Sequence, residues 1–382
     1  MSPSPCEPSS AAPIAPNRNP GIDLLRGLSI LLVVIHHVGL CIPLKQGVLA
    51  IFLPKWALSA LIYNGYEAVF VFFVISGFLI TLNSLTRWGS LGAIDIRTFY
   101  ARRGARILPC LLVLVAVLSA LHLLGASDYV ISHANQSLPR AIFSALGLHL
   151  NWYEGHTGYL PGNWDVLWSL SIEEVFYLAF PLLCLGLRRK RLLVPLLLAL
   201  ALALPASRAA LAGNAIWQEK AYLPGMGGIA MGVLAALVAA HLRPQPRGAI
   251  HVLRGLSLAG LIAVLCFEGK LWPLLGNGCM LLLTLSAAGL VLACHLAVRD
   301  GSARALPGLG WLRSFGRLSY EIYLTHMFVV WPVIHLFRAR GGHLWWGILW
   351  YLPVLAGSWL LGWLVARYFS TPAEQRLRRA WA

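Results

Sequence analysis

Residues 22–42 read IDLLRGLSILLVVIHHVGLCI, an apolar stretch of transmembrane length that contains Asp23, Arg26 and His37. A helix needs about 20 predominantly apolar residues to cross the hydrocarbon core of a bilayer. The stretch therefore predicts a membrane-spanning helix. Its ionisable side chains mark it as a candidate functional segment, because such groups are costly inside a bilayer.

Similar apolar blocks recur along the 382 residues, of which 58% are hydrophobic and only 12% are charged. A soluble domain is roughly 45–50% apolar and about 25% charged. We therefore predict an all-α, polytopic transmembrane helix bundle of about ten spans. The expected spans are residues 22–42, 60–83, 106–125, 168–187, 192–207, 222–242, 252–267, 272–297, 317–337 and 344–367. The block 141–150 is too short to span, and a re-entrant and an interfacial position are both open for it.

The distribution of basic residues predicts the orientation of the bundle. With a cytoplasmic N-terminus, 22 of the 30 Lys and Arg residues fall on the cytoplasmic side, as the positive-inside rule requires. Both termini are then cytoplasmic. Residues 1–20 are rich in Pro, Ser and Ala and are predicted to be a disordered tail. Residues 21–370 form the expected membrane domain, followed by a basic tail over 371–382. The net charge of +16 is explained by these loops, so no nucleic-acid partner is expected.

A polar stripe is predicted on the first span. At about 100° per residue, Arg26 and His37 project about 20° apart, and Asp23 lies within about 40° of His37. His36 points about 80° away. The stripe makes His37 the candidate catalytic histidine, with a packed histidine bonded to a neighbouring helix as the alternative.

Charged and polar residues near three other segments are further candidates. Glu173, near the extracytoplasmic end of the fourth span, could hold the His37 ring in one tautomer, or serve only as helix N-terminal charge. Arg103 and Arg106 share a helix face and suit phosphate oxygens, although ordinary cytoplasmic charge is the alternative. The aromatic residues of 127–167 suit an interfacial belt and sugar stacking equally well.

Five strings, in order, resemble the acyltransferase-3 family of integral membrane O-acyltransferases over roughly residues 20–370. They are Asp23 with Arg26-Gly27 and His37; Val71-Phe-Phe-Val-Ile-Ser76-Gly77-Phe78-Leu-Ile-Thr81; Arg103 with Arg106; Trp168-Ser169-Leu170 through Glu173 to Phe176-Tyr177; and Ser319-Tyr320-Glu-Ile-Tyr323-Leu324-Thr-His326.

The resemblance implies an enzyme of the bacterial inner (cytoplasmic) membrane that moves an acyl group, expected to be acetyl, from cytoplasmic acyl-CoA. The acceptor is a hydroxyl of an envelope sugar or polysaccharide such as O-antigen or exopolysaccharide. Acyl-CoA is then a co-substrate, with no permanently bound cofactor and no metal. The alternative is a transporter or flippase for a glycan or lipid-linked sugar, whose polar residues line a substrate path.

The resemblance also implies roles for individual residues. His37 acts as general base or transient acyl carrier, and Glu173 orients it. The phosphates of acyl-CoA are held by Arg26, Arg103 and Arg106. Secondary candidates are Asp23, Ser169, Tyr323 and His326.

Overall fold

The computed structural model describes residues 18–186 and 190–381, and its regular elements are all helical. Within these ranges, eight helices are long and apolar enough to cross a membrane, and two bent helix pairs raise the number to ten. The prediction of an all-α bundle with about ten spans is confirmed. The predicted N-terminal tail lies, except for residues 18–20, outside the described residues.

The spans are built on α1 (Pro20–Gly39), α4 (Gly65–Trp88), α5 (Ile96–Leu123), α9 (Trp168–Gly186), α13 (Tyr222–His241), α14 (Arg247–Leu275), α15 (Gly278–Arg299) and α19 (Tyr351–Val365). The first bent pair is α10 (Lys190–Leu202) with α11 (Leu204–Ala210), and the second is α17 (Ser319–Thr325) with α18 (Met327–Ala339). The second pair turns by 50° at His326. The predicted span 317–337 is therefore a broken helix with His326 at the break.

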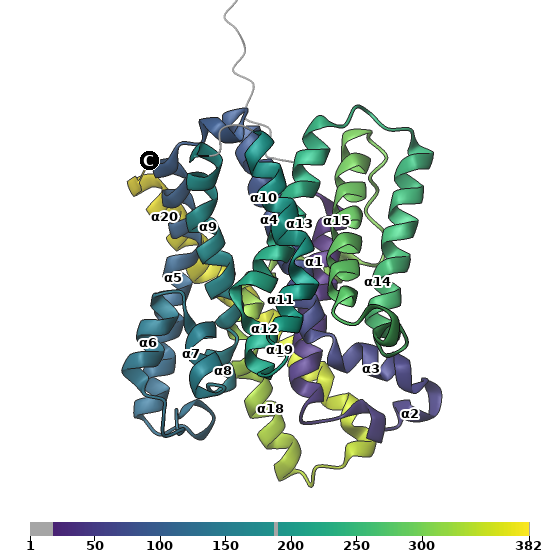
Figure 1. The fold of residues 1–382 in the computed structure, drawn as a ribbon. Coiled ribbons are helices and arrows are strands. Elements are labelled where there is room, and N and C mark those ends of the chain that lie inside the picture. Colours follow the sequence, from purple (N-terminus) through teal and green to yellow (C-terminus); the bar gives the residue numbers. More distant parts are fainter. Residues whose placement is uncertain (1–17, 187–189, 382) are drawn as a thin grey trace, which may run out of the picture.

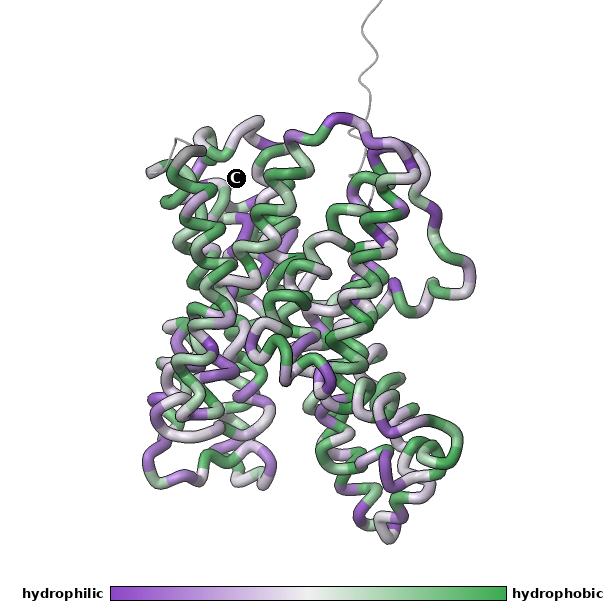
Figure 2. Tube along the Cα trace, turned by 45° about the vertical axis from the view of Figure 1, so that its right-hand side comes forward, coloured by the Kyte–Doolittle hydropathy of each residue, from purple (hydrophilic) through white to green (hydrophobic). Residues whose placement is uncertain are grey.

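Shorter helices cap the two ends of the bundle. They are α2 (Leu49–Phe52), α3 (Lys55–Tyr63), α6 (Leu138–Leu146), α7 (Leu150–Thr157), α8 (Gly162–Asp165), α12 (Ala215–Lys220), α16 (Gly310–Arg317) and α20 (Thr371–Trp381). Figure 1 shows α20 at the upper end and α2, α3 and α18 at the lower end. This arrangement agrees with the prediction that successive loops lie at alternate ends of the bundle. The assignment of the upper end to the cytoplasm stays a prediction. Figure 2 shows hydrophobic colours along most helix shafts and many hydrophilic segments at the two ends.

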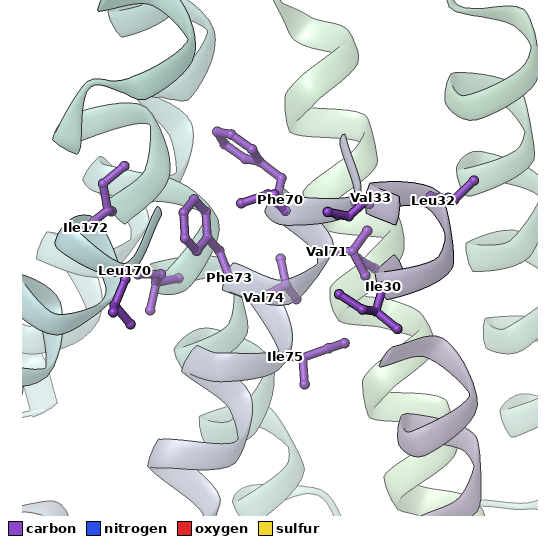
Figure 3. Close-up of a cluster of buried hydrophobic side chains, with 14 of the residues drawn as sticks. Ile30, Leu32, Val33, Phe70, Val71, Phe73, Val74, Ile75, Leu170 and Ile172 are labelled. Atoms are coloured by element: carbon purple, nitrogen blue, oxygen red, sulfur yellow. The ribbon is translucent and has the colours of Figure 1, made fainter. Parts of the chain in front are cut away.

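Helix α4 is the centre of the bundle and packs against α1, α13 and α15. A Cβ atom on Gly77 would lie 2.0 Å from the carbonyl oxygen of Ile229, and one on Gly232 would lie 2.0 Å from that of Val74. Glycine is needed at both positions because the backbones of α4 and α13 touch, as small residues allow in membrane bundles. Figure 3 shows buried apolar side chains of α1, α4 and α9 gathered in one cluster, which includes Val74.

Helix α1 is fixed against the C-terminal third of the chain. A Cβ atom on Gly27 would lie 2.0 Å from the carbonyl oxygen of Leu312, and one on Gly316 would lie 1.8 Å from that of Asp23. The backbones of α1 and α16 are thus in direct contact. Because α17 follows α16, this contact also sets α1 beside α17.

Candidate active site

A polar cavity of about 670 Å³ lies between α1, α4, α5, α9, α17 and α20. It extends along α4 from Val69 to Asn83, roughly 21 Å at about 1.5 Å of rise per residue. We call it the polar cavity. Six of the predicted site residues line it, namely Arg26, Arg103, Arg106, Ser169, Glu173 and Tyr323.

The polar cavity has an excess of positive charge. Its charged lining consists of Arg18, Arg26, Arg103, Arg106, Arg317 and Arg378 together with Glu173, Glu174, Glu321 and Glu374. Arginine offers planar, multidentate donors that match phosphate oxygens. The segment 371–381, predicted as a tail, forms α20 and contributes Glu374 and Arg378 to this lining.

The three predicted arginines differ in how they are held. The Arg26 guanidinium donates to Ser319 Oγ through Nη2 at 2.8 Å and through Nε at 3.2 Å. Arg106 forms ion pairs with Glu321 and Glu374, each at 3.2 Å, and Glu321 is almost completely buried. The Arg103 guanidinium stacks 3.9 Å from the ring centroid of Tyr177.

Arg103 therefore differs from the other two in its hydrogen bonding. Within residues 18–186 and 190–381, its guanidinium forms no hydrogen bond and no ion pair. A cation stacked on an aromatic face keeps its N–H groups available while its plane is fixed. Arg103 is thus the predicted arginine with the greatest capacity to bind a substrate phosphate.

His37 contacts a second histidine, His326, at the break between α17 and α18. The Nδ1 atom of His37 lies 2.8 Å from the carbonyl oxygen of Val33 and 3.3 Å from Nε2 of His326. The Nδ1 atom of His326 lies 2.9 Å from the carbonyl oxygen of Tyr323. Carbonyl oxygens only accept, so each neutral ring is assigned its proton on Nδ1.

This tautomer assignment defines the chemistry of the pair. The Nδ1–H of His37 points to Val33 and to the Nε2 lone pair of His326, so Nε2 of His37 carries the lone pair that a general base needs. A charged His37 ring would be stabilised by the His326 acceptor. Arg26 and His37 both bond to the α17–α18 segment, so they lie along one side of α1 as the angular count predicts.

The remaining predicted site residues form hydrogen bonds or ion pairs with residues other than the two histidines. Glu173 accepts hydrogen bonds from Ser76 of α4 and from Tyr177, and among the described residues it forms no hydrogen bond with His37. Ser169 Oγ and Tyr323 Oη are 2.7 Å apart. Asp23 lies outside the polar cavity lining and pairs with Arg18 at 3.6 Å.

The ring of Tyr323 connects the polar cavity to the histidine pair. Its hydroxyl also donates to the carbonyl oxygen of Val166 at 2.9 Å. Its ring centroid is 6.2 Å from that of His326, and the His326 centroid is 4.9 Å from that of His37. His37 and His326 are not among the residues that line the polar cavity; they lie behind Tyr323, which does line it.

A buried ionic cluster beyond the histidines was not predicted. Lys220 Nζ lies 3.0 Å from Glu154 and also contacts Asp165. Burial and the Asp165 carboxylate raise the pKa of Glu154 well above its usual range. The signal in the sequence was Lys220, which stands directly before the apolar span 222–242. The count of basic residues assigned this lysine to an extracytoplasmic loop.

The described residues contain no group of three or more His, Cys, Asp or Glu side chains arranged to hold a metal ion. What they do contain is a membrane bundle whose polar cavity is lined by arginines suited to a phosphorylated substrate and by Tyr323, whose ring lies next to the His37–His326 pair. This combination defines the class as a membrane-embedded transferase.

Comparison with known proteins identifies the family. The model of a family described as an acyltransferase domain, acyltransferase-3, matches residues 19–368. The chain belongs to this family. The expected enzyme class, an acyltransferase, is thereby confirmed, and the match favours this reading over the transporter alternative.

The relatives are bacterial proteins. The chain is 25% identical over 385 residues to the peptidoglycan O-acetyltransferase OatA of Listeria monocytogenes, an alignment that covers 93% of this chain and 56% of that protein. It is 32% identical over 173 residues to a putative O-acetyltransferase of Staphylococcus aureus, covering 44% of this chain and 25% of the relative. The chain thus spans little more than half of the first relative. No solved structure matches it.

Proposed function

We infer that this protein transfers an acetyl group from acetyl-CoA to a hydroxyl of an envelope glycan. The observation that carries the inference is the polar cavity, whose arginine-lined part is connected through Tyr323 to the His37–His326 pair. The family membership and the names of the bacterial relatives support the acyl-transfer chemistry.

The donor enters the polar cavity from the end at which α20 lies. With the predicted orientation, that end faces the cytoplasm, where acetyl-CoA is available. Arg103, Arg26 and Arg106 bind its phosphates, Arg103 with N–H groups that no residue in the described part of the chain bonds to. The elongated shape of the cavity along α4 suits a donor whose phosphates and reactive thioester lie far apart.

The acceptor hydroxyl approaches His37 from the opposite side of the bundle. His37 Nε2 removes the hydroxyl proton as the oxygen attacks the thioester carbonyl carbon. The carbon–sulfur bond breaks, and the CoA thiolate takes up the proton from His37, leaving the O-acetyl ester and CoA. His326 positions the base through its contact with Nδ1 of His37. A general base contributes typically about 10²–10⁴-fold to a rate.

The acceptor is a glycan outside the cytoplasmic membrane of a bacterium. Candidate acceptors are O-antigen, exopolysaccharide and peptidoglycan, the last because the Listeria relative is named as a peptidoglycan O-acetyltransferase. Trp152 and His156 at the lower end of the bundle are exposed, and their rings lie 4.1 Å apart between centroids and are tilted by 42°. Such an aromatic surface suits contact with a sugar ring.

The test is the mass of envelope glycans from cells with the intact protein, without it, or with His37→Ala. We expect an acetyl-sized increment with the intact protein and its loss, by at least about 100-fold, in the variant. His36→Ala is the matched control, since His36 bonds to the carbonyl oxygen of Ile62 at 2.8 Å and packs against Gly65.

Two results would contradict the proposal. Equal loss of the increment in His36→Ala and His37→Ala, with both proteins present in the membrane at normal levels, would remove the special role of His37. Unmodified glycans in all strains, with one glycan missing from the outer face without the protein, would favour a transporter.

A further inference from the structure

A second cavity, of about 530 Å³, lies on the other side of α1, between α1, α14, α15 and the segment 302–313. We call it the apolar cavity. Its volume falls within the range of roughly 300–1,000 Å³ that is typical of ligand sites. The acyl-transfer mechanism does not use it, and none of the residues predicted for the reaction line it.

The walls of the apolar cavity are made of aliphatic side chains in helical register. Helix α1 contributes Leu24, Leu28 and Leu32, which are spaced four residues apart and share one face. Further lining residues are Leu258, Leu261, Ile262 and Leu265 of α14 and Leu290 and Ala297 of α15. These walls would accommodate a hydrocarbon chain running parallel to the helices.

One end of this hydrocarbon-lined space is closed by polar contacts. The side-chain amide of Asn19 donates to the carbonyl oxygen of Cys294 at 3.0 Å and joins the start of α1 to α15. The lateral wall formed by α14 is more open, since Leu258 is 42% and Ile262 53% exposed in the bundle. A lipid chain would therefore enter from the bilayer beside α14.

Three arginines line the apolar cavity, and no carboxylate or lysine does. They are Arg254 of α14, Arg304 of the segment after α15, and Arg313 of α16. Within the described ranges, their guanidinium groups form no hydrogen bond and no ion pair. The Nη1 atom of Arg313 is buried without a partner. Buried charged donors are normally paired, so this atom is available to bind an anion.

The placement of these arginines matches a phospholipid. Arg254 lies two turns into α14 from Arg247, Arg304 lies in the connection after α15, and Arg313 lies in the short helix α16 that follows it. All three are at the bundle end with the predicted cytoplasmic loops. Basic pockets between membrane helices on that side bind anionic lipid headgroups.

We propose that the apolar cavity binds an anionic phospholipid of the adjoining leaflet. Its phosphate is held by Arg313, Arg254 and Arg304, and one acyl chain lies between α1, α14 and α15. The lipid supplies the anion that the buried Arg313 atom lacks.

The test uses the purified full-length chain in detergent and native mass spectrometry. Phosphatidylglycerol, phosphatidylcholine of the same chain length, and inorganic phosphate are added separately. We expect adducts that form at least about tenfold more readily with phosphatidylglycerol, the scale of a charge-assisted hydrogen bond. Arg313→Gln should remove that preference. Arg247→Gln, which changes the same charge on the exposed partner of Asp300, should keep it.

A second measurement locates the lipid even if a variant fails to fold. Phosphatidylglycerol with a photoreactive acyl chain should label peptides of α14 and α15 that contain residues 258–265 and 290–297 in the unmodified protein. Labelling confined to other helices, or equal binding of both lipids, would overturn the proposal. The proposal would also be overturned if the protein bound inorganic phosphate but neither lipid displaced that phosphate.

Discussion

The two cavities of this protein lie on opposite sides of α1 and use the same charged residue type in different ways. In the polar cavity, Arg26 is held by Ser319, Arg106 by two glutamates, and Arg103 by stacking on the ring of Tyr177. In the apolar cavity, Arg254, Arg304 and Arg313 have no such partners among the described residues. Arginines held in place are suited to orienting a reacting substrate. Unpaired arginines above an aliphatic wall fit a lipid headgroup.

Helix α1 separates the two cavities through its own periodicity. Leu24 and Leu28 line the apolar cavity, whereas Arg26, two residues from each, lines the polar one. Two residues correspond to about 200° around a helix, so Arg26 projects nearly opposite to them. One helix thus forms a wall of the polar cavity on one face and a wall of the apolar cavity on the other.

The largest expected difference between the cavities concerns stability. Arg106→Gln leaves the buried Glu321 without its cation and should cost about 3 kcal/mol, whereas Arg254→Gln in the apolar cavity leaves no carboxylate unpaired and should cost much less. Thermal unfolding of the purified variants measures both. The double variant Arg106→Gln/Glu321→Gln should recover part of the loss. Equal destabilisation by Arg106→Gln and Arg254→Gln would break the comparison.

The next largest effect concerns the histidine pair, which only the polar cavity has. His326→Ala should lower kcat by about tenfold to a hundredfold, the scale of a hydrogen bond to a charged group. KM for acetyl-CoA should change little, because His326 lies away from the arginines. A purely structural role would instead lower the apparent kcat through loss of folded protein, which size-exclusion chromatography detects. Binding of phosphatidylglycerol should be unaffected.

A reciprocal pair of variants then separates the two ligands. Arg103→Gln should raise KM for acetyl-CoA by about tenfold and leave phosphatidylglycerol adducts unchanged. Arg313→Gln should leave KM for acetyl-CoA unchanged and remove the preference for phosphatidylglycerol. Acetyl-CoA titrations and native mass spectrometry on the same preparations measure both quantities. If Arg313→Gln weakened the donor as strongly as Arg103→Gln, the apolar cavity would belong to donor binding.

The smallest predicted effect concerns the connection between the polar cavity and the histidines. Tyr323→Phe removes one hydroxyl that bonds to Ser169 and to the Val166 carbonyl, and should lower kcat roughly two- to tenfold. Ser169→Ala removes the other member of the pair. Combining both changes should cost less than the sum of the single effects if the hydroxyls act together. Strict additivity would show that they act separately.

The sequence predicted those features that depend on local pattern. Apolar block length and the alternation of basic loops were sufficient for the spans, and helical periodicity was sufficient to place Arg26 and His37 on one side of α1. Arg26, Arg103 and Arg106 were predicted for one ligand, and the structure brings them into one cavity. The functional assignment of these residues stays a proposal.

Long-range pairing was not predictable from local pattern. The break at His326 leaves no proline or glycine signal, since the residues around it are Thr325 and Met327. Glu173 was predicted to orient His37, but its hydrogen bonds in the described structure go to Ser76 and Tyr177. The choice of partner depends on how the helices are rotated against each other, which local pattern does not determine. The Lys220 cluster depends on three segments that meet only in the fold.

The contact of α1 with α16 and α17 has a consequence for biosynthesis. Arg26 bonds to Ser319 and His37 to His326, residues 293 and 289 positions later. A ribosome adds roughly 5–20 residues per second, so α1 enters the membrane about 15–60 s before its partners exist. During that interval its arginine and histidine have no α17 to bond with. These contacts of α1 form only when nearly the whole chain has been inserted, so a polypeptide truncated before α16 lacks Ser319, Tyr323 and His326 and, by the proposed mechanism, should have no transferase activity.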